Sequence, residues 1–351
     1  MIKLKNKKGE FLMKRVKIVL IVCSLILLSS MLVFAEQPKY SLKFSTAATP
    51  QEPQTQGFMK FAEIIEKLTN GNIKVTVYHS GQLADQKTQV LGTMRGDIDM
   101  SDGSPTWFAD LIPYPEIGVL EAAYAYKNLD HLYHVLNGPI GKAYWDELRK
   151  RSGLVVLDTW FLGTRQLNFI KDVGEVRVPE DLKGVKLRMP GSEVWMDVGR
   201  GLGAQPTPLG FNEVYMALKT GTIDGQDNPL PTDYSSKFYE VTHYIVLTDH
   251  QMTIINPTIN EKVWESMPDD YKVYMKMALL AGRYHCNQLV LEQEASLIAK
   301  FQNEFGMEII IPNKAAFMEN VKKVYEKNDS IWGKGVYEMI QNASSELYEA
   351  K

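Results

Sequence analysis

Cysteine is nearly absent from this 351-residue chain, which contains only Cys23 and Cys286. Cys23 lies in an apolar N-terminal stretch that we expect to be removed, so Cys286 is the only cysteine of the mature protein. A lone cysteine excludes an intramolecular disulfide and a cysteine-ligated metal cluster. The mature chain must therefore be stabilised by packing, and it is long enough for a substantial core and for two lobes.

Only one hydrophobic run is long enough to reach across a bilayer, and it lies at residues 18–35. It follows seven lysines and arginines and ends in Val33-Phe34-Ala35, with small residues at the two positions that a signal peptidase reads. This pattern predicts a cleaved signal peptide over residues 1–35 and a periplasmic location. An uncleaved membrane anchor is the alternative, because the run is just long enough to span.

Basic residues are outnumbered by acidic ones. The whole chain has 39 lysines and arginines against 42 acids, and removal of residues 1–35 takes away seven bases and one acid. The mature chain then has 32 bases and 41 acids, a net charge of −9. Such a balance argues against nucleic acid as a partner. A binding site for an anion would have to be a local feature.

Recognisable catalytic motifs are also missing. The sequence has no G-x-S-x-G, no H-E-x-x-H, no P-loop and no G-x-G-x-x-G on a strand–helix turn. His131 and His134 are three residues apart on a predicted helix, but no third ligand completes a metal motif nearby. We therefore expect no catalytic residue, no cofactor and no metal.

Hydrophobic patterning predicts an α/β protein. Strands are expected at the start of 40–50, at 72–80 and at 97–105, and helices at 57–71 and 88–96. This β-α-β-α-β order is typical of an open, mostly parallel sheet with helices on its faces.

Two longer-range patterns suggest two lobes. The sequence helix–Gly–x–Ile–Asp occurs at Gly96–Asp99 and again at Gly221–Asp224, although chance recurrence is an alternative. Residues 267–306 predict one very long helix, or two in line with a bend near Gly282. Forty helical residues extend roughly 60 Å. That is too long for one lobe, so we expect this helix to cross both.

Polar residues stand at the ends of predicted strands. Arg165 follows the apolar run 153–161, which predicts a strand buried on both faces. Arg188 ends the next strand just before the corner Pro190-Gly191, and Asn228 follows a third strand. Open α/β sheets bind ligands at such ends, and a guanidinium grips a carboxylate with two parallel hydrogen bonds. The three residues predict a carboxylate site, and an ordinary structural role for each is the alternative.

The sequence around these residues resembles a known family. "GTRQLNF", "DLKGVKLRMPG", "GAQPTPLGFNEVYMALKTGTIDGQDNP" and "KFYEVTHYIVLTDH" resemble the extracytoplasmic solute receptors of tripartite ATP-independent periplasmic (TRAP) transporters. The resemblance implies a two-lobed α/β periplasmic binding protein with mixed sheets flanked by helices and a long helix spanning both lobes. The expected lobes are 36–162 plus about 254–293, and 163–253 plus about 294–351.

The resemblance also implies roles for individual residues. Arg188 is expected to pair with the substrate carboxylate, Arg165 to assist it and Asn228 to contact the same group. Phe211 is expected to line the pocket. The Pro190-Gly191 corner would then hold Arg188 in place.

Other positions bear on the identity of the ligand. Ala47 and Ser104 stand about where sialic-acid receptors have a polar residue and a carboxylate, which disfavours sialic acid. Trp107 and Trp160 are expected either to wall the pocket or to pack in the core. A sugar acid such as a hexuronate or aldonate is the first expectation, and a C4-dicarboxylate is the second.

The resemblance implies a binding protein rather than an enzyme. A monomeric receptor would carry an organic acid to the membrane subunits of a sodium-driven transporter. Two rivals remain at this stage: a secreted enzyme on the same scaffold, and a receptor that presents its ligand to a sensor on another chain.

Overall fold

Residues 37–343 are described by the structure, a computed structural model, and the predicted signal peptide at 1–35 lies outside them. The expected β-α-β-α-β segment is confirmed as β1 (Tyr40–Ser45), α2 (Pro53–Leu68), β2 (Ile73–Tyr78), α3 (Gln86–Arg95) and β3 (Met100–Gly103). β1 pairs in parallel with both β2 and β3. α3 ends at Gly96, whose φ of 85° is a left-handed conformation that suits glycine.

One long strand joins the two halves of the sheet. The remaining strands are β4 (Leu154–Val156), β5 (Trp160–Phe169), β6 (Lys186–Met189), β7 (Gln205–Pro208), β8 (Gly225–Pro229), β9 (Tyr244–Asn260) and β10 (Glu308–Ile310). The strand order is β2-β1-β3-β9-β5-β8-β6-β7, with β4 and β10 also paired to β9. The last residues of β9 pair with β3 and its earlier residues pair with β5, both antiparallel.

The apolar stretch 153–161 does not form the single strand that its sequence predicts. β4 ends at Val156 and β5 starts at Trp160. Between them, the Asp158 carboxylate accepts a hydrogen bond from Trp160 Nε1 at 3.0 Å and lies 2.5 Å from Arg283 Nη1. A polar contact thus interrupts the run, and β5 continues to Phe169. Arg165 therefore lies inside a strand rather than beyond its end, which corrects the expectation.

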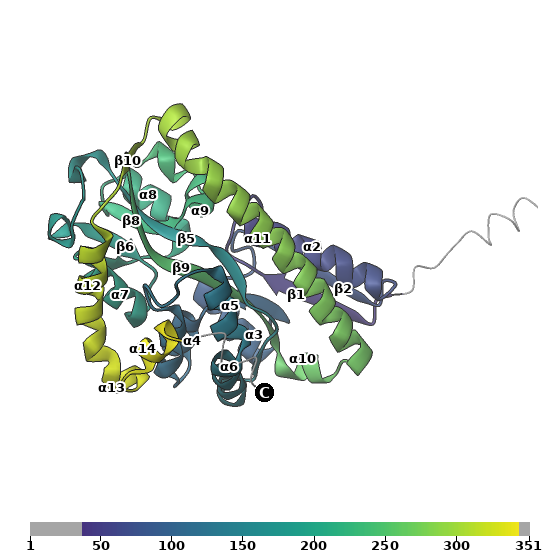
Figure 1. Cartoon of the computed structure of the whole chain (residues 1–351). Helices are drawn as coiled ribbons and strands as arrows, with labels where there is room; N and C mark the ends of the chain where they lie inside the picture. Colours follow the sequence, from purple (N-terminus) through teal and green to yellow (C-terminus); the bar gives the residue numbers. More distant parts are fainter. Residues whose placement is uncertain (1–36, 344–351) are drawn as a thin grey trace, which may run out of the picture. The chain divides into compact units, whose positions relative to one another are not determined.

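The predicted long helix is confirmed as α11 (Asp269–Phe305), which has 37 residues and extends about 55 Å at the usual rise. It packs against α2, β5 and α9 and runs past both halves of the sheet (Figure 1). Gly282 of α11 faces Gly57 of α2, and a Cβ on Gly282 would lie 2.7 Å from the Gly57 carbonyl oxygen. The two helices are therefore in close backbone contact.

Shorter helices cover the sheet. They are α4 (Pro105–Leu111), α5 (Leu129–Asn137), α6 (Pro139–Ser152), α7 (Glu193–Gly201), α8 (Val214–Lys219), α9 (Leu230–Ser235), α10 (Glu261–Glu265), α12 (Lys314–Tyr325), α13 (Asp329–Trp332) and α14 (Val336–Gln341). Within residues 37–343, no helix combines the length and the apolar character needed to cross a membrane.

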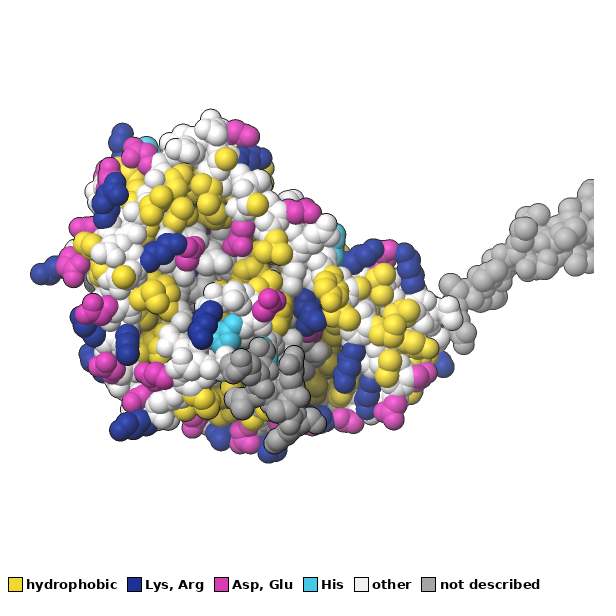
Figure 2. All heavy atoms as spheres, in the orientation of Figure 1, with side chains coloured by type: hydrophobic (Ala, Val, Ile, Leu, Met, Phe, Trp, Pro, Cys, Tyr) yellow, Lys and Arg dark blue, Asp and Glu magenta, His cyan; other side chains and the backbone are white. Residues whose placement is uncertain are grey.

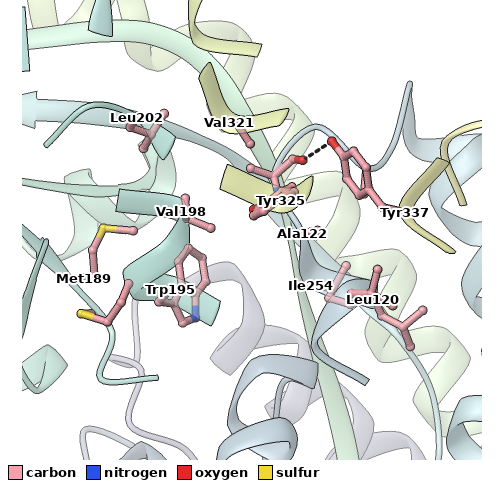
Figure 3. Close-up of a cluster of buried hydrophobic side chains, with 14 of the residues drawn as sticks. Leu120, Ala122, Met189, Trp195, Val198, Leu202, Ile254, Val321, Tyr325 and Tyr337 are labelled. Atoms are coloured by element: carbon pink, nitrogen blue, oxygen red, sulfur yellow. Dashed lines mark hydrogen bonds between the residues drawn. The ribbon is translucent and has the colours of Figure 1, made fainter. Parts of the chain in front are cut away.

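Two large hydrophobic clusters form the core. One contains Phe44 of β1, Phe58 of α2 and Trp160 of β5, together with buried residues of α11. The other joins α7 to α12, and Figure 3 shows Trp195 and Val198 in it with the labelled residues around them. Trp195 also reaches the candidate site described below, so the position of this side chain is fixed by core packing.

The α/β fold class with helices flanking a mixed sheet is confirmed. The predicted lobe boundaries meet in space, since Gly163 of β5 pairs with Thr253 of β9. The pairing is irregular immediately before Gly163, where φ is 117°. The boundaries themselves stay a prediction.

Candidate functional site

Seven of the eight predicted site residues line a single cavity. They are Ala47, Ser104, Trp107, Arg165, Arg188, Phe211 and Asn228. The cavity lies between the loop after β1, β3 and α4 on one side and β5, β6 and β8 on the other. The chain thus brings together residues that are up to 181 positions apart, from Ala47 to Asn228.

Trp160 is the exception, because it is absent from the cavity lining. It is completely buried, and its ring centroid lies 4.7 Å from that of Phe58. Its ring also fills the space beside Gly57 and Gly282. Trp160 therefore packs in the core, which is the second of the two roles expected for it.

Arg188 is held rigidly at the end of β6. The chain turns at Pro190, and Ser192 begins α7 by accepting a hydrogen bond from the Trp195 backbone at 3.4 Å. The Arg188 side chain is 1% exposed, and its Nε donates to the Leu209 carbonyl at 3.0 Å.

The charge of Arg188 has no close counter-ion. Within residues 37–343, no carboxylate oxygen lies within 4.0 Å of its guanidinium. Burial lowers the pKa of Arg188 to about 9, against a smaller opposite influence of Asp227. The side chain is thus a desolvated cation whose two terminal nitrogens remain available to an anion.

Arg165 has a different environment. Its Nε donates to Asp227 Oδ2 at 2.5 Å and a terminal nitrogen donates to the Asp227 carbonyl. Its guanidinium carbon lies 4.4 Å from the centroid of the Trp195 ring. Burial alone would raise the pKa of Asp227, but Arg165 and His250 outweigh it and hold that pKa below its usual value. Arg165 is therefore already paired.

The direction of β5 explains why Arg165 reaches the cavity from a strand interior. β5 runs antiparallel to β8, and Arg165 stands opposite Pro229 at the carboxyl end of β8. β8 runs parallel to β6, so Asn228 and Arg188 come from carboxyl ends on the same edge. The Asn228 amide donates to Gln226 Oε1 at 2.6 Å, which orients it.

Aromatic side chains form the apolar wall. Phe211 packs edge-on against Phe238 with ring centroids 6.2 Å apart, and Trp107 is almost fully buried. Trp195, which the sequence analysis did not single out, donates from Nε1 to Thr106 Oγ1 at 2.9 Å. A wider hollow adjoins the cavity and shares Phe211 and Trp107 with it.

Three buried carboxyl groups in the cavity were not foreseen: Glu52, Asp102 and Glu121. Burial raises the pKa of each to about 7. Asp102 lies within β3, all four residues of which are buried, but the sequence Met-Ser-Asp-Gly has no apolar pattern that would have indicated this burial. On the face of the molecule that Figure 2 shows, acidic and basic side chains are intermingled.

Comparisons with known proteins agree with this architecture. The family model for bacterial extracellular solute-binding protein, family 7, matches residues 44–330. The sialic acid-binding periplasmic protein SiaP of Vibrio cholerae is 32% identical over 297 residues, which are 84% of this chain and 90% of that protein.

Solved structures give the same result. A TRAP periplasmic solute-binding protein from Roseobacter denitrificans with bound L-galactonate is 28% identical, with a TM-score of 0.81 over 87% of this chain and 99% of that one. A TRAP periplasmic solute-binding protein from Sulfurospirillum deleyianum with bound succinate is 27% identical, with a TM-score of 0.81 over 88% and 100%.

Proposed function

The chain belongs to family 7 of the bacterial extracellular solute-binding proteins, and we propose that it is a periplasmic receptor that captures a sugar acid for a TRAP transporter. The expected family membership is confirmed. Its family and the structures it matches are binding proteins. In the proposed role the chain binds its ligand without changing it and delivers it to membrane subunits as a monomer.

The observation that carries the proposal is the unpaired guanidinium of Arg188. A buried charge without a counter-ion costs free energy, and the cost is offset when a ligand supplies the missing anion. A carboxylate fits, because its two oxygens match two parallel N–H donors of a guanidinium. Asn228 lies at the same sheet edge and Arg165 next to it, so both are proposed to contact the same ligand end.

Two ligand classes are supported by neighbours of this chain. The Roseobacter denitrificans protein holds L-galactonate, which is a sugar acid, and the Sulfurospirillum deleyianum protein holds succinate, which is a C4-dicarboxylate. We favour the sugar acid because the cavity combines aromatic rings with several polar side chains. Phe211 and Trp107 are proposed to pack against the carbon chain or ring, with Ala47 and Ser104 beside them.

A ligand screen tests the proposal. The exported protein is heated with uronates, aldonates, C4-dicarboxylates and neutral sugars, and its melting temperature is recorded. At a ligand concentration 100 times Kd, binding stabilises the protein by about 2.7 kcal/mol, so a clear rise is expected for at least one carboxylic acid. If no acid raises the melting temperature, or if neutral sugars raise it equally, the proposal fails.

Transport and sensing predict different partners. A receptor for transport binds to the membrane subunits of a TRAP transporter, whereas a receptor for sensing binds to a sensor domain. Reconstitution with the membrane subunits of a TRAP transporter from the same organism, followed by uptake of the labelled acid, tests delivery. Uptake that proceeds equally without the receptor would refute the transport role.

A further inference from the structure

The polar groups around the cavity are sorted by element. The donors Arg165, Arg188 and Asn228 come from β5, β6 and β8, whereas Glu52 directly precedes α2 and Asp102 lies on β3. In the sheet, β9 separates β3 from β5, so donors and acids come from different halves. Glu52 and Asp102 line the same cavity, and burial raises the pKa of Glu52 against the opposing hydrogen bonds from Thr49 and Thr232.

Both acids are oriented by the protein and still have acceptor capacity. Glu52 accepts hydrogen bonds from the Thr49 backbone at 3.0 Å and from Thr232 Oγ1 at 3.3 Å. Asp102 accepts one from Thr46 Oγ1 at 2.9 Å and another from a glutamine amide of α3. An ionised carboxylate has about four acceptor positions. Each acid therefore keeps lone pairs for a ligand in the cavity.

Two further oxygens in the cavity wall have no partner in the described part of the chain: Gln54 Oε1 and Thr253 Oγ1. Both residues are 7% exposed. A buried polar atom without a hydrogen bond costs about 1–3 kcal/mol. Gln54 Oε1 can only accept and the Thr253 hydroxyl can do both, so a ligand that brings hydroxyl donors would satisfy them.

We propose that Glu52, Asp102 and Gln54 form an acceptor subsite that binds the hydroxyl groups of a polyhydroxy monocarboxylic acid and rejects a second carboxylate. This inference rests on the proposed function, because it assumes that the single carboxylate of the ligand binds to Arg188. The ligand then spans the cavity, with its acceptor end at β6 and its donor end at β3 and the start of α2.

The chemistry of the subsite separates three ligand classes. When Glu52 and Asp102 are ionised, above the pKa of about 7 that burial gives them, a dicarboxylate would place a second anion beside like charges in a desolvated site, where they repel each other. A hydroxyl group is both donor and acceptor, which suits a wall that contains carboxyl groups, an amide oxygen and the Thr253 hydroxyl. An ammonium group could donate to the two acids and to Gln54 Oε1, but it has no lone pair to accept the proton of the Thr253 hydroxyl.

Titration calorimetry of the exported protein provides the test. The probes are galactonate, gluconate, galacturonate and glucuronate as hydroxylated monoacids, and hexanoate as a monoacid without hydroxyls. Galactarate has the carbon chain of galactonate and a carboxylate at each end, and succinate and lysine complete the panel. We expect at least one hydroxylated monoacid to bind tenfold or more tightly than hexanoate, galactarate, succinate and lysine.

Matched variants locate the effect. Asp102→Asn and Glu52→Gln keep size and remove charge, and each should weaken binding of the best sugar acid about tenfold or more while changing hexanoate binding less than threefold. Glu63→Gln, an exposed change on α2, is the control and should leave all affinities unchanged. Thermal melts of each variant confirm folding.

The outcomes separate this inference from the proposed function. If no carboxylic acid binds, both fail. If succinate or galactarate binds as tightly as the best sugar acid, or lysine binds more tightly, the acceptor subsite is wrong while carboxylate capture stands. The inference is also overturned if both variants bind the sugar acid like the wild type.

Discussion

Replacing Arg188 by methionine should make the empty protein more stable and unable to bind its ligand. Arg188 is 1% exposed, and within residues 37–343 no carboxylate lies within 4.0 Å of its guanidinium. Methionine has a similar length and needs no counter-ion. Exchanges of buried charged groups for apolar side chains of similar volume are often neutral or stabilising by about 1–4 kcal/mol. For a mature chain of 316 residues that amounts to about 1.5–6 °C in melting temperature, at about 2.1 cal/mol/K of unfolding entropy per residue.

Binding should change in the opposite direction. Removing one member of a buried, hydrogen-bonded charge pair costs about 2–5 kcal/mol, and each 1.4 kcal/mol is a factor of ten in affinity. Arg188→Met should therefore weaken binding about 30-fold or more. Arg188→Lys keeps a charge but loses the fork of two donors, so it should also bind poorly and should gain no stability.

Calorimetric titration of the cognate acid and thermal melts without ligand measure the two effects on the same samples. An exposed change, Arg95→Met, serves as the control and should alter neither. If Arg188→Met melts well below the wild type while Arg188→Lys binds normally, Arg188 is a structural residue. The carboxylate would then be held elsewhere.

Three further predictions follow from the described contacts. Burial raises the pKa of Asp102 to about 7, so the native state holds a proton that the unfolded chain releases near pH 4. The stability that this proton provides is present below pH 4 and is lost as the pH rises through 7. In Asp102→Asn, the free energy of unfolding measured by urea titration should therefore fall less between pH 4 and pH 8 than in the wild type. Gly282→Ala should lower the free energy of unfolding by about 1–3 kcal/mol, because its Cβ would lie 2.7 Å from a carbonyl oxygen of α2; a smaller loss would show that the helices separate easily. Trp160→Ala should lower the free energy of unfolding by about 3–5 kcal/mol, because it truncates a core side chain, whereas Trp107→Ala should mainly weaken ligand binding. If the two variants lose the same stability in urea titrations and the same affinity in calorimetric titrations, these separate roles are contradicted.

Local patterns predicted the elements that depend on near neighbours. The strand that carries Arg188 and the Ser192 N-cap follow from alternation and corner residues within about fifteen positions. The long helix follows from an uninterrupted run between Pro268 and Gly306, and it is present as α11. Each of these features is fixed by the backbone preferences of its own segment, so no distant contact was needed to infer it.

Features that depend on distant pairing were missed. The sequence around Arg165 does not show that β5 runs antiparallel to β8, so the arginine was expected beyond a strand end. Trp160 and Trp107 look alike in sequence, yet only Trp160 meets the two glycines that bring α2 and α11 together. Likewise, nothing in the sequence near Asp102 shows that Glu52 lines the same cavity.

The pairing of Arg165 decides how much positive charge the cavity offers. Asp227 binds Arg165 directly and also contacts His250 Nε2 at 3.1 Å, so that arginine is balanced before any ligand enters. Arg188 is then the one unbalanced cation of the predicted set, and it can be balanced by one carboxylate. A second carboxylate would find no second unbalanced arginine there and would meet Glu52 and Asp102 instead. This count of balanced and unbalanced charges supports the proposal that the ligand carries a single carboxylate, and it does so independently of any relative's ligand.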